Sequence, residues 1–160
     1  MAVDTLYTTA TDLLAAAVTA LACEDRRVPD LTFVSWAPPV WDCELLAVHL
    51  DGASFDEVRG VRCAAVPSAR FGLTLLRCWP VIEQVDGDII EAAAAHLLAD
   101  TWALVRHFAA GWSNGTLVTT ASCDGVRLGQ VSMLGPAGGL AGVSLTVTVA
   151  PQDTDPPCGS

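Results

Sequence analysis

Two segments of the chain carry apolar residues at helical spacing. The first runs from about Thr8 to Cys23, where Thr8 or Thr9 provides an N-terminal cap and a charged run after Cys23 ends the pattern. This segment predicts an N-terminal helix with one buried face. Its apolar stripe consists of Leu6, Leu13, Leu14, Ala17, Val18 and Leu21.

The second segment predicts a long amphipathic helix. Ile89 to Ala110 contains neither Gly nor Pro, Asp88 with Glu91 resembles a capping box, and Gly111 stands at the expected C-terminal cap. We therefore expect one uninterrupted helix over this range. Its apolar stripe comprises Ile90, Ala94, Leu97, Thr101, Leu104 and Phe108.

Alternating apolar and polar positions predict strands between and after these helices. In Val143–Val149 every second residue is apolar, so that one face is buried and the Ser/Thr face is free for water or a partner. The Gly-rich residues 135–142 lead into this strand without a lysine, which indicates a hairpin loop rather than a phosphate loop. The expected strands are Leu31–Val34, Glu44–Leu50, Val61–Val66, Arg70–Trp79, Gly115–Thr120, Val126–Leu134 and Val143–Val149.

These elements predict an α/β protein of the α+β kind, with the N-terminal helix and the long helix packed on a mainly antiparallel sheet. The chain has 160 residues, which fits one domain. We assign residues 1–150 to that domain and residues 151–160, rich in Pro and Asp, to a flexible C-terminal tail. The hydrophobic share of 52% suffices for a core and excludes a wholly disordered chain.

Charge excludes a broad phosphate-binding surface. The formal net charge is −10, and all 8 basic residues are Arg because the sequence contains no Lys. Electrostatic binding of nucleic acid needs clustered cations instead. The preference for Arg, Ala, Val and Gly indicates a GC-rich genome.

The apolar run Leu13–Cys23 has the length of a signal-peptide core. No Lys or Arg precedes it, whereas Asp4 and Asp12 do, so a secretion signal or a lipoprotein cleavage site before Cys23 is disfavoured. The run is also shorter than the ~18 apolar residues of a membrane span. We expect a soluble, unprocessed chain with no membrane partner.

The cysteines are widely spaced, without a C-x-x-C pair. Free buried thiols are favoured over a disulfide framework, because the chain has an ample core and no export signal. The even number keeps disulfides open as the alternative, and the wide spacing argues against structural zinc. The six positions are Cys23, Cys43, Cys63, Cys78, Cys123 and Cys158.

The residue types that usually carry catalysis lack a suitable neighbourhood. His49 falls in an apolar strand, and His96 and His107 are about three helical turns apart, too far to share a ligand. His96 and Asp100 are expected to form a helix-surface pair, and the guanidinium of Arg77 is expected to reach water at a strand end. No nucleophile motif appears. We predict no catalytic residue, no cofactor and no metal site, and therefore no enzyme.

Candidate interface residues come from three places. Trp36 and Trp41 flank Pro38-Pro39, where two indoles suit a partner interface as well as core packing. The exposed loop Asp51–Gly60 and the polar face of the last strand are expected to supply further contacts, including strands added across subunits. The loop contributes Phe55 and Arg59, and the last strand contributes Ser144, Thr146 and Thr148.

The order of the predicted elements and their residue composition provide a further indication of the kind of protein. The segments that carry it are Leu13–Val18, Leu45–Leu50, Phe71–Leu76, Ala92–Phe108 and Gly139–Val147, and they span most of residues 5–150. This layout resembles the tail terminator proteins of long-tailed bacteriophages (siphoviruses), and the composition is similar to that of phages with GC-rich actinobacterial hosts. None of these segments is a specific motif alone.

The resemblance implies helices on a mainly antiparallel sheet and a ring, usually of six copies, at the head-proximal end of the tail tube. Such a ring stops tube polymerisation and joins the head connector. The implied partners are other copies of the chain, the major tail tube protein and the head-to-tail connector or stopper. The implied location is the virion tail and neck, after assembly in the host cytoplasm, with no catalytic residues.

The net charge adds the hypothesis of an acidic ring lumen, through which DNA passes without specific binding. Two alternatives stay open. One is another neck protein, a connector or stopper. The other is a small ligand-binding or enzymatic α+β domain, motivated by His49, the cysteines and the Gly-rich loop.

Overall fold

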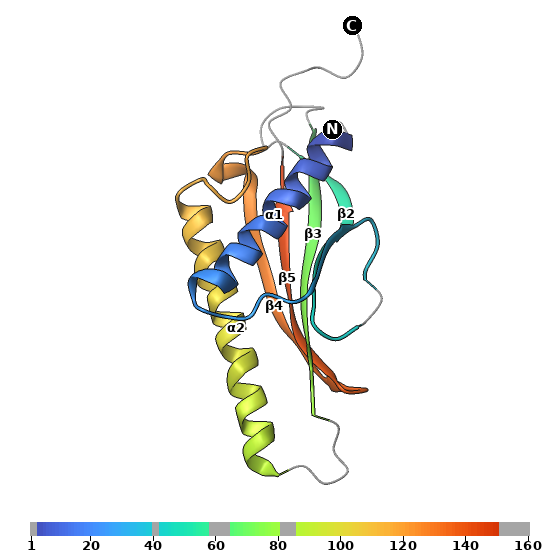
Figure 1. The fold of residues 1–160 in the computed structure, drawn as a ribbon. Coiled ribbons are helices and arrows are strands. Elements are labelled where there is room, and N and C mark those ends of the chain that lie inside the picture. The colour runs from blue at the N-terminus through green and yellow to red at the C-terminus, as the bar shows by residue number, and fades with distance from the viewer. Residues whose placement is uncertain (1–2, 40–41, 58–64, 81–85, 151–160) are drawn as a thin grey trace, which may run out of the picture.

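The computed structural model describes residues 3–39, 42–57, 65–80 and 86–150. Five strands form one sheet in the order β1-β2-β3-β5-β4, in which β1 runs parallel to β2 and every other pair is antiparallel (Figure 1). The predicted α+β class with a mainly antiparallel sheet is confirmed. The elements are α1 (Val3–Cys23), β1 (Leu31–Ser35), β2 (Leu45–Glu57), β3 (Ala65–Cys78), α2 (Gly87–Ser113), a 3-10 turn η1 (Cys123–Gly125), β4 (Val126–Ala137) and β5 (Leu140–Val149).

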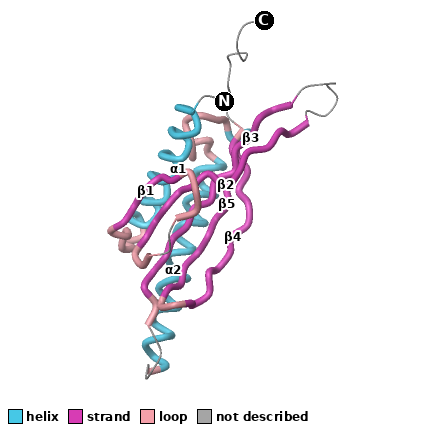
Figure 2. The backbone as a smooth tube through the Cα atoms, turned by 90° about the vertical axis from the view of Figure 1, so that its right-hand side faces the viewer, coloured by secondary structure: helices cyan, strands magenta, loops and turns pink. Residues whose placement is uncertain are grey.

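Both helices cover the same face of the sheet, and the described residues place no helix on the other face (Figure 2). Alternation along the strands sends one set of apolar side chains under the helices, where Phe71 of β3 meets the core that contains Phe108 of α2. The stripe of α1 contributes Leu13, Ala17 and Leu21 to that core. Because each helix and strand buries one side in this core, apolar residues recur at helical spacing in the helices and at every second position in the strands, and both patterns could be recognised in the sequence.

We call the helix-free side of the sheet the open face. Strand register places Thr74 of β3 beside Ser144 of β5, and His49 of β2 opposite Gly72 of β3. Short hydroxyl side chains therefore run across this face. A smaller apolar cluster lies on the same face and consists of Leu45, Ala47 and Leu76, with Phe33 and Leu134 packed against it.

The β2–β3 hairpin continues past the other strands as an arm (Figure 2). Within it, residues Ala53–Glu57 pair with Ala65–Ala69, after a bulge between Leu50 and Gly52. The pairing of β1 with β2 ends at His49, and that of β5 with β3 begins at Ala69. Beyond Ala69, which still pairs with Val149 of β5, the arm is two strands wide, and both of its outer edges are unpaired among the described residues.

Several predicted boundaries were wrong. The Asp51-Gly52 pair lies inside β2 rather than ending it, so residues 51–57 of the predicted loop are strand. Two predicted strands, Val61–Val66 and Arg70–Trp79, overlap a single β3, with residues 61–64 outside the described part of the chain. The long, paired hairpin overrides local turn signals because ladder hydrogen bonds and cross-strand contacts stabilise it.

The predicted strand Gly115–Thr120 is absent from the sheet. Leu117 and Val118 are instead buried in the core beneath α1. The backbone of this segment is held by side chains, since Asp12 of α1 accepts hydrogen bonds from both the N–H and the hydroxyl of Thr119 at 2.7 Å. Tertiary packing therefore replaced the expected strand pairing.

The helix ends also differ from the prediction. α1 begins at Val3, before the predicted Thr cap, and α2 begins at Gly87. The N-cap of α2 is Asp86, whose side chain makes no capping hydrogen bond, rather than Asp88. Gly111 lies within the helix, and Asn114 caps its end ahead of Gly115, which adopts a positive φ of 67°.

Residues Asp4–Cys23 of α1 are long and apolar enough to cross a membrane by length and composition alone, contrary to the expectation from the shorter Leu13–Cys23 run. Core helices pass the same test. One face of this helix packs on the sheet through Ala10, Leu13, Ala17, Ala20 and Leu21.

Candidate functional site

A buried carboxylate on α2 joins two arginines from different parts of the chain. Asp100 Oδ2 accepts a hydrogen bond from Arg77 Nε at 2.9 Å, and Asp100 Oδ1 accepts one from Arg26 Nε at 2.7 Å. The Asp100 side chain is only 3% exposed. A buried carboxylate needs such partners, because loss of hydration is otherwise uncompensated.

The two arginines extend this contact into a network, which we call the Asp100 cluster: Arg26, Glu44, Arg77, His96 and Asp100. Arg77 Nη1 donates to Glu44 Oε2 at 2.8 Å, and its Nη2 donates to the backbone oxygen of Arg27. Arg26 Nη2 donates to the backbone oxygen of His96 at 3.1 Å and lies 3.1 Å from its Nδ1. The cluster joins the segment after α1, the residue before β2, the end of β3 and α2.

A hollow of about 460 Å³ opens beside the cluster. Its charged lining consists of Arg26, Arg27, Arg77, Asp25, Glu44 and Asp100, so that three formal positive charges face three negative ones. The guanidinium groups of Arg26 and Arg77 are engaged with carboxylates and backbone oxygens inside the network, and that of Arg27 pairs with Asp30 outside it. This arrangement clamps the fold and leaves no net charge in the hollow to attract an ion.

The cluster was missed from the sequence. Arg77 does not extend into water, because its side chain is 13% exposed and bound to Asp100 and Glu44. Asp100 does not form a surface pair with His96, because it is buried and turned to the arginines. The sequence did carry a signal for this cluster. Asp100 and Arg77 each lie within an apolar face, and opposite charges in such positions are expected to pair.

A disulfide joins Cys43 and Cys78, with a Cα–Cα distance of 4.7 Å. The prediction of free thiols was therefore wrong for these two residues. The β2–β3 pairing ends at Leu45 and Leu76, and Cys43 lies in the bend just before β2, where Glu44 has a positive φ of 58°. The bond therefore joins this bend to the end of β3. A separation of 35 residues in sequence hides this adjacency.

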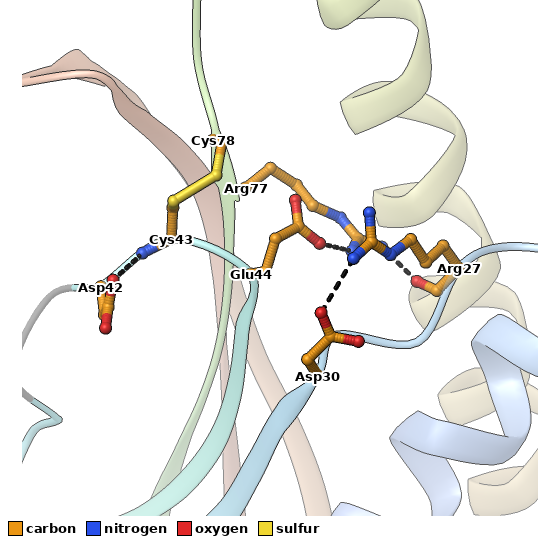
Figure 3. Close-up of a disulfide and its surroundings, with 7 residues drawn as sticks. All are labelled: Arg27, Asp30, Asp42, Cys43, Glu44, Arg77 and Cys78. Carbon is orange, nitrogen blue, oxygen red and sulfur yellow. Dashed lines mark hydrogen bonds and ion pairs between the residues drawn. A yellow bond between two sulfur atoms is a disulfide. The ribbon is translucent and has the colours of Figure 1, made fainter.

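The disulfide and the Glu44–Arg77 ion pair lie on opposite sides of the backbone where the bend before β2 meets the end of β3 (Figure 3). Arg77 and Cys78 are successive residues of β3 and point to opposite faces, and Arg77 binds Asp100 of α2, so the ion pair is on the helix face and the disulfide on the open face. Of the other cysteines, Cys23 is an exposed free thiol. Cys63 and Cys158 lie outside the described residues, and the side chain of Cys123 is not among those described.

His49 is a buried imidazole on the open face. Its Nδ1 has no hydrogen-bond partner in the described structure, and a Cβ at Gly72 would lie 2.5 Å from its Cε1. The ring thus occupies the space above Gly72. Burial lowers the pKa of His49, while the nearby Asp51 carboxylate acts in the opposite direction.

Exposed apolar side chains gather at the two edges of the sheet. The α2 flank consists of Leu98, Trp102 and Trp112 on one side of α2 and Met133 on β4; Leu98 and Trp102 are 60% and 62% exposed. Thr101 approaches Met133 Sδ at 3.9 Å and Trp112 Nε1 donates to Val126 O at 2.9 Å, so α2 runs alongside this edge strand.

The β1 flank lies at the opposite edge and consists of Leu31 and Trp36, which are 45% and 51% exposed. A hollow of about 400 Å³ lies beside it, between β1 residues and Pro38, Pro39 and Asp42. The molecule therefore presents two different apolar flanks, each next to a strand with one unpaired edge in the described sheet.

The predicted interface residues do not form one surface. Trp36 belongs to the β1 flank, while the side chains of Ser144, Thr146 and Thr148 lie half-buried on the open face of β5. Strand addition at β5 is excluded, because β3 and β4 pair with its two edges. Phe55 is in the arm without a described side chain, and Trp41 and Arg59 lie outside the described residues.

Within the described part of the chain, no group of three His, Cys, Asp or Glu side chains is placed to hold a metal ion. Comparison of the sequence with models of known protein families and with curated proteins finds no match.

Proposed function

We propose that this chain is a virion structural protein that forms a ring at the head-proximal end of a phage tail tube. The ring ends tube polymerisation and joins the tail to the head connector, as the resemblance to tail terminators implies. The observation that supports the proposal best is the pair of unlike apolar flanks at opposite edges of one sheet.

Two unlike complementary surfaces on one molecule favour head-to-tail contacts. Repeated contacts of this kind close into rings when the rotation between neighbours permits it. In this sheet, β1 and β4 have opposite directions. A second copy in the same orientation would therefore bring its β1 antiparallel to β4, and its Trp36 toward the α2 flank. Six copies are the number that the resemblance suggests.

The arm and the open face are our candidates for contacts with the tail tube protein and the connector. A two-stranded hairpin is marginally stable by itself, so an arm with two unpaired edges is suited to receive strands from a partner. The hydroxyls of Ser144, Thr146 and Thr148 offer donors and acceptors to a polar partner surface.

DNA is proposed to pass through the ring without specific binding. The net charge of −10 supports this, because DNA phosphates and an acidic protein repel each other. Titration of the purified ring with duplex DNA at low salt checks it. No retention is expected, whereas salt-sensitive binding would count against this part of the proposal.

The decisive experiment measures mass in solution and then images mixtures with purified tail tubes and with head connectors by electron microscopy. We expect a closed ring that sits on one end of the tube and blocks further growth. A ring that binds the connector but leaves tube growth unchanged would identify another neck protein instead. A stable monomer that binds neither partner would contradict the ring and favour a ligand-binding domain.

A further inference from the structure

The Cys43–Cys78 disulfide stands where small thiols can reach it. Cys78 is exposed and Cys43 is half-buried. Exchange requires an attacking thiolate to reach a sulfur of the disulfide, so accessible bonds exchange and deeply buried bonds do not. Cys78 is the more exposed of the two residues, so its sulfur is our candidate for the attack, with Cys43 as the leaving thiolate.

The Glu44–Arg77 ion pair behind the disulfide allows the covalent bond to open without loss of the sheet. Glu44 follows Cys43 in the bend before β2, Arg77 precedes Cys78 on β3, and Arg77 is also bound to Asp100 of α2. These contacts hold the start of β2 against the end of β3 on the helix face. They do not depend on the covalent bond, so the two strands remain paired after reduction.

The edge strand β1 depends on the same region, where the chain enters β2 beside the end of β3. The N–H of Leu31, the first residue of β1, donates to the backbone oxygen of Glu44 at 3.3 Å. β1 has five residues and pairs only with β2 in the described sheet. The backbone next to Cys43 therefore supports the first hydrogen bond of the most weakly held strand.

We propose that Cys43 and Cys78 form a reversible thiol–disulfide exchange site for small thiols, and that its redox state sets the order at the start of β1. A small thiolate attacks Sγ of Cys78, the Cys43–Cys78 bond breaks, and Cys43 leaves as a thiolate. A second small thiolate then attacks the mixed disulfide and releases Cys78. Two small thiols are oxidised to one disulfide while the protein gains two thiols, and the reverse reaction closes the bond. This inference stands independently of the proposed function.

The test uses the full chain in buffers of reduced and oxidised glutathione. Alkylation of free thiols followed by peptide mass spectrometry measures the oxidised fraction of Cys43–Cys78, and hydrogen exchange measures the order of the backbone. On reduction we expect the Leu31 and Cys43 amides to exchange at least about tenfold faster, while Leu73 and Leu75 stay within about twofold. Reoxidation should restore the original rates.

Three variants sharpen the result. Cys23→Ser removes an exposed thiol that is not part of the disulfide and should leave every rate unchanged. Cys43→Ser with Cys78→Ser should exchange like the reduced chain in either buffer. Arg77→Met removes the ion pair behind the disulfide, so reduction should then extend the faster exchange to Leu45 and Leu76.

Two results would overturn the proposal. One is a pair that stays entirely reduced or entirely oxidised across the glutathione ratios. The other is reduction of the unmutated chain that either changes no rate at β1 or unfolds the whole sheet. Because chemical reduction needs no substitution, the outcome does not depend on how well the variants fold.

Discussion

Arg77 on β3 and Asp100 on α2 are 23 positions apart in sequence, and their side chains are joined at 2.9 Å near the end of β3. Arg26 holds the other oxygen of the same carboxylate. One carboxylate thus fixes the position of α2 relative to both the sheet and the segment after α1. The apolar core alone, being non-directional, would not specify that register.

Asp100→Asn is expected to destabilise the protein by about 3 kcal/mol, because Arg26 and Arg77 lose the charge that compensates their desolvation. Urea unfolding followed by far-UV circular dichroism measures the change. The matched control is Asp30→Asn, which breaks the exposed pair with Arg27 and should shift the free energy of unfolding by less than about 0.5 kcal/mol. Equal effects at the two positions would contradict a special role for Asp100.

Gly72→Ala is expected to cost about 1–3 kcal/mol of stability, because the new Cβ would lie 2.5 Å from the His49 ring. A double-mutant cycle with His49→Ala tests the cause, since the penalty should shrink once the ring is gone. Gly135→Ala serves as the control, because nothing lies within 4 Å of a Cβ at that position. A Gly72→Ala penalty that is the same with and without His49 would point to the backbone instead.

Stability is expected to fall as the pH drops below about 6.5. The folded-state pKa of His49 is lowered by burial, so the unfolded chain binds the proton more readily. The contribution of neutral His49 is therefore complete above the unfolded pKa and is lost as the pH falls through 6.5 toward the lowered folded pKa. Its slope cannot exceed about 1.4 kcal/mol per pH unit.

Urea midpoints between pH 5 and pH 7.5 measure this dependence. His49→Gln should flatten it. A His49→Gln chain with an unchanged slope would assign the pH dependence to other groups.

Trp102→Glu and Trp36→Glu are each expected to abolish ring formation while leaving the fold intact, since both side chains are largely exposed. The two variants lose different flanks. Mixed together, they should therefore form a dimer through the one intact pair of flanks and stop there. Sedimentation velocity of each variant and of the mixture measures the masses. A mixture that stays monomeric would show that the two flanks do not bind each other.

The sequence predicted the elements whose side chains alternate between core and solvent. The stripe with Leu97, Leu104 and Phe108 marks α2, and the alternation from Val143 to Val149 marks β5. The position of each strand among its neighbours in the sheet could not be predicted from this alternation. β5 carries the pattern of a strand with one buried face, and that pattern is the same whether its edges are free or paired.

The candidate site was harder to predict because its contacts join distant residues. Arg26 and Asp100 are 74 positions apart, and Cys43 and Cys78 are 35 positions apart and meet only where the bend before β2 reaches the end of β3. Short-range spacing rules evaluate neighbours within a few turns or strand steps, so they assigned Arg77 to water and the cysteines to free thiols. The exposed side chains of the α2 flank were missed for a related reason: the same helix also supplies the core.

The interior place of β5 has a consequence for how the chain folds during synthesis. β4 is synthesised before β5 but reaches the sheet only through it, since the strand order is β1-β2-β3-β5-β4. A nascent chain that ends before Leu140 can pair β1, β2 and β3 but has nowhere to attach β4. The two flanks therefore exist together only once β5 has been synthesised, so a nascent chain that ends before Leu140 lacks one of the two surfaces that we propose to join neighbouring copies.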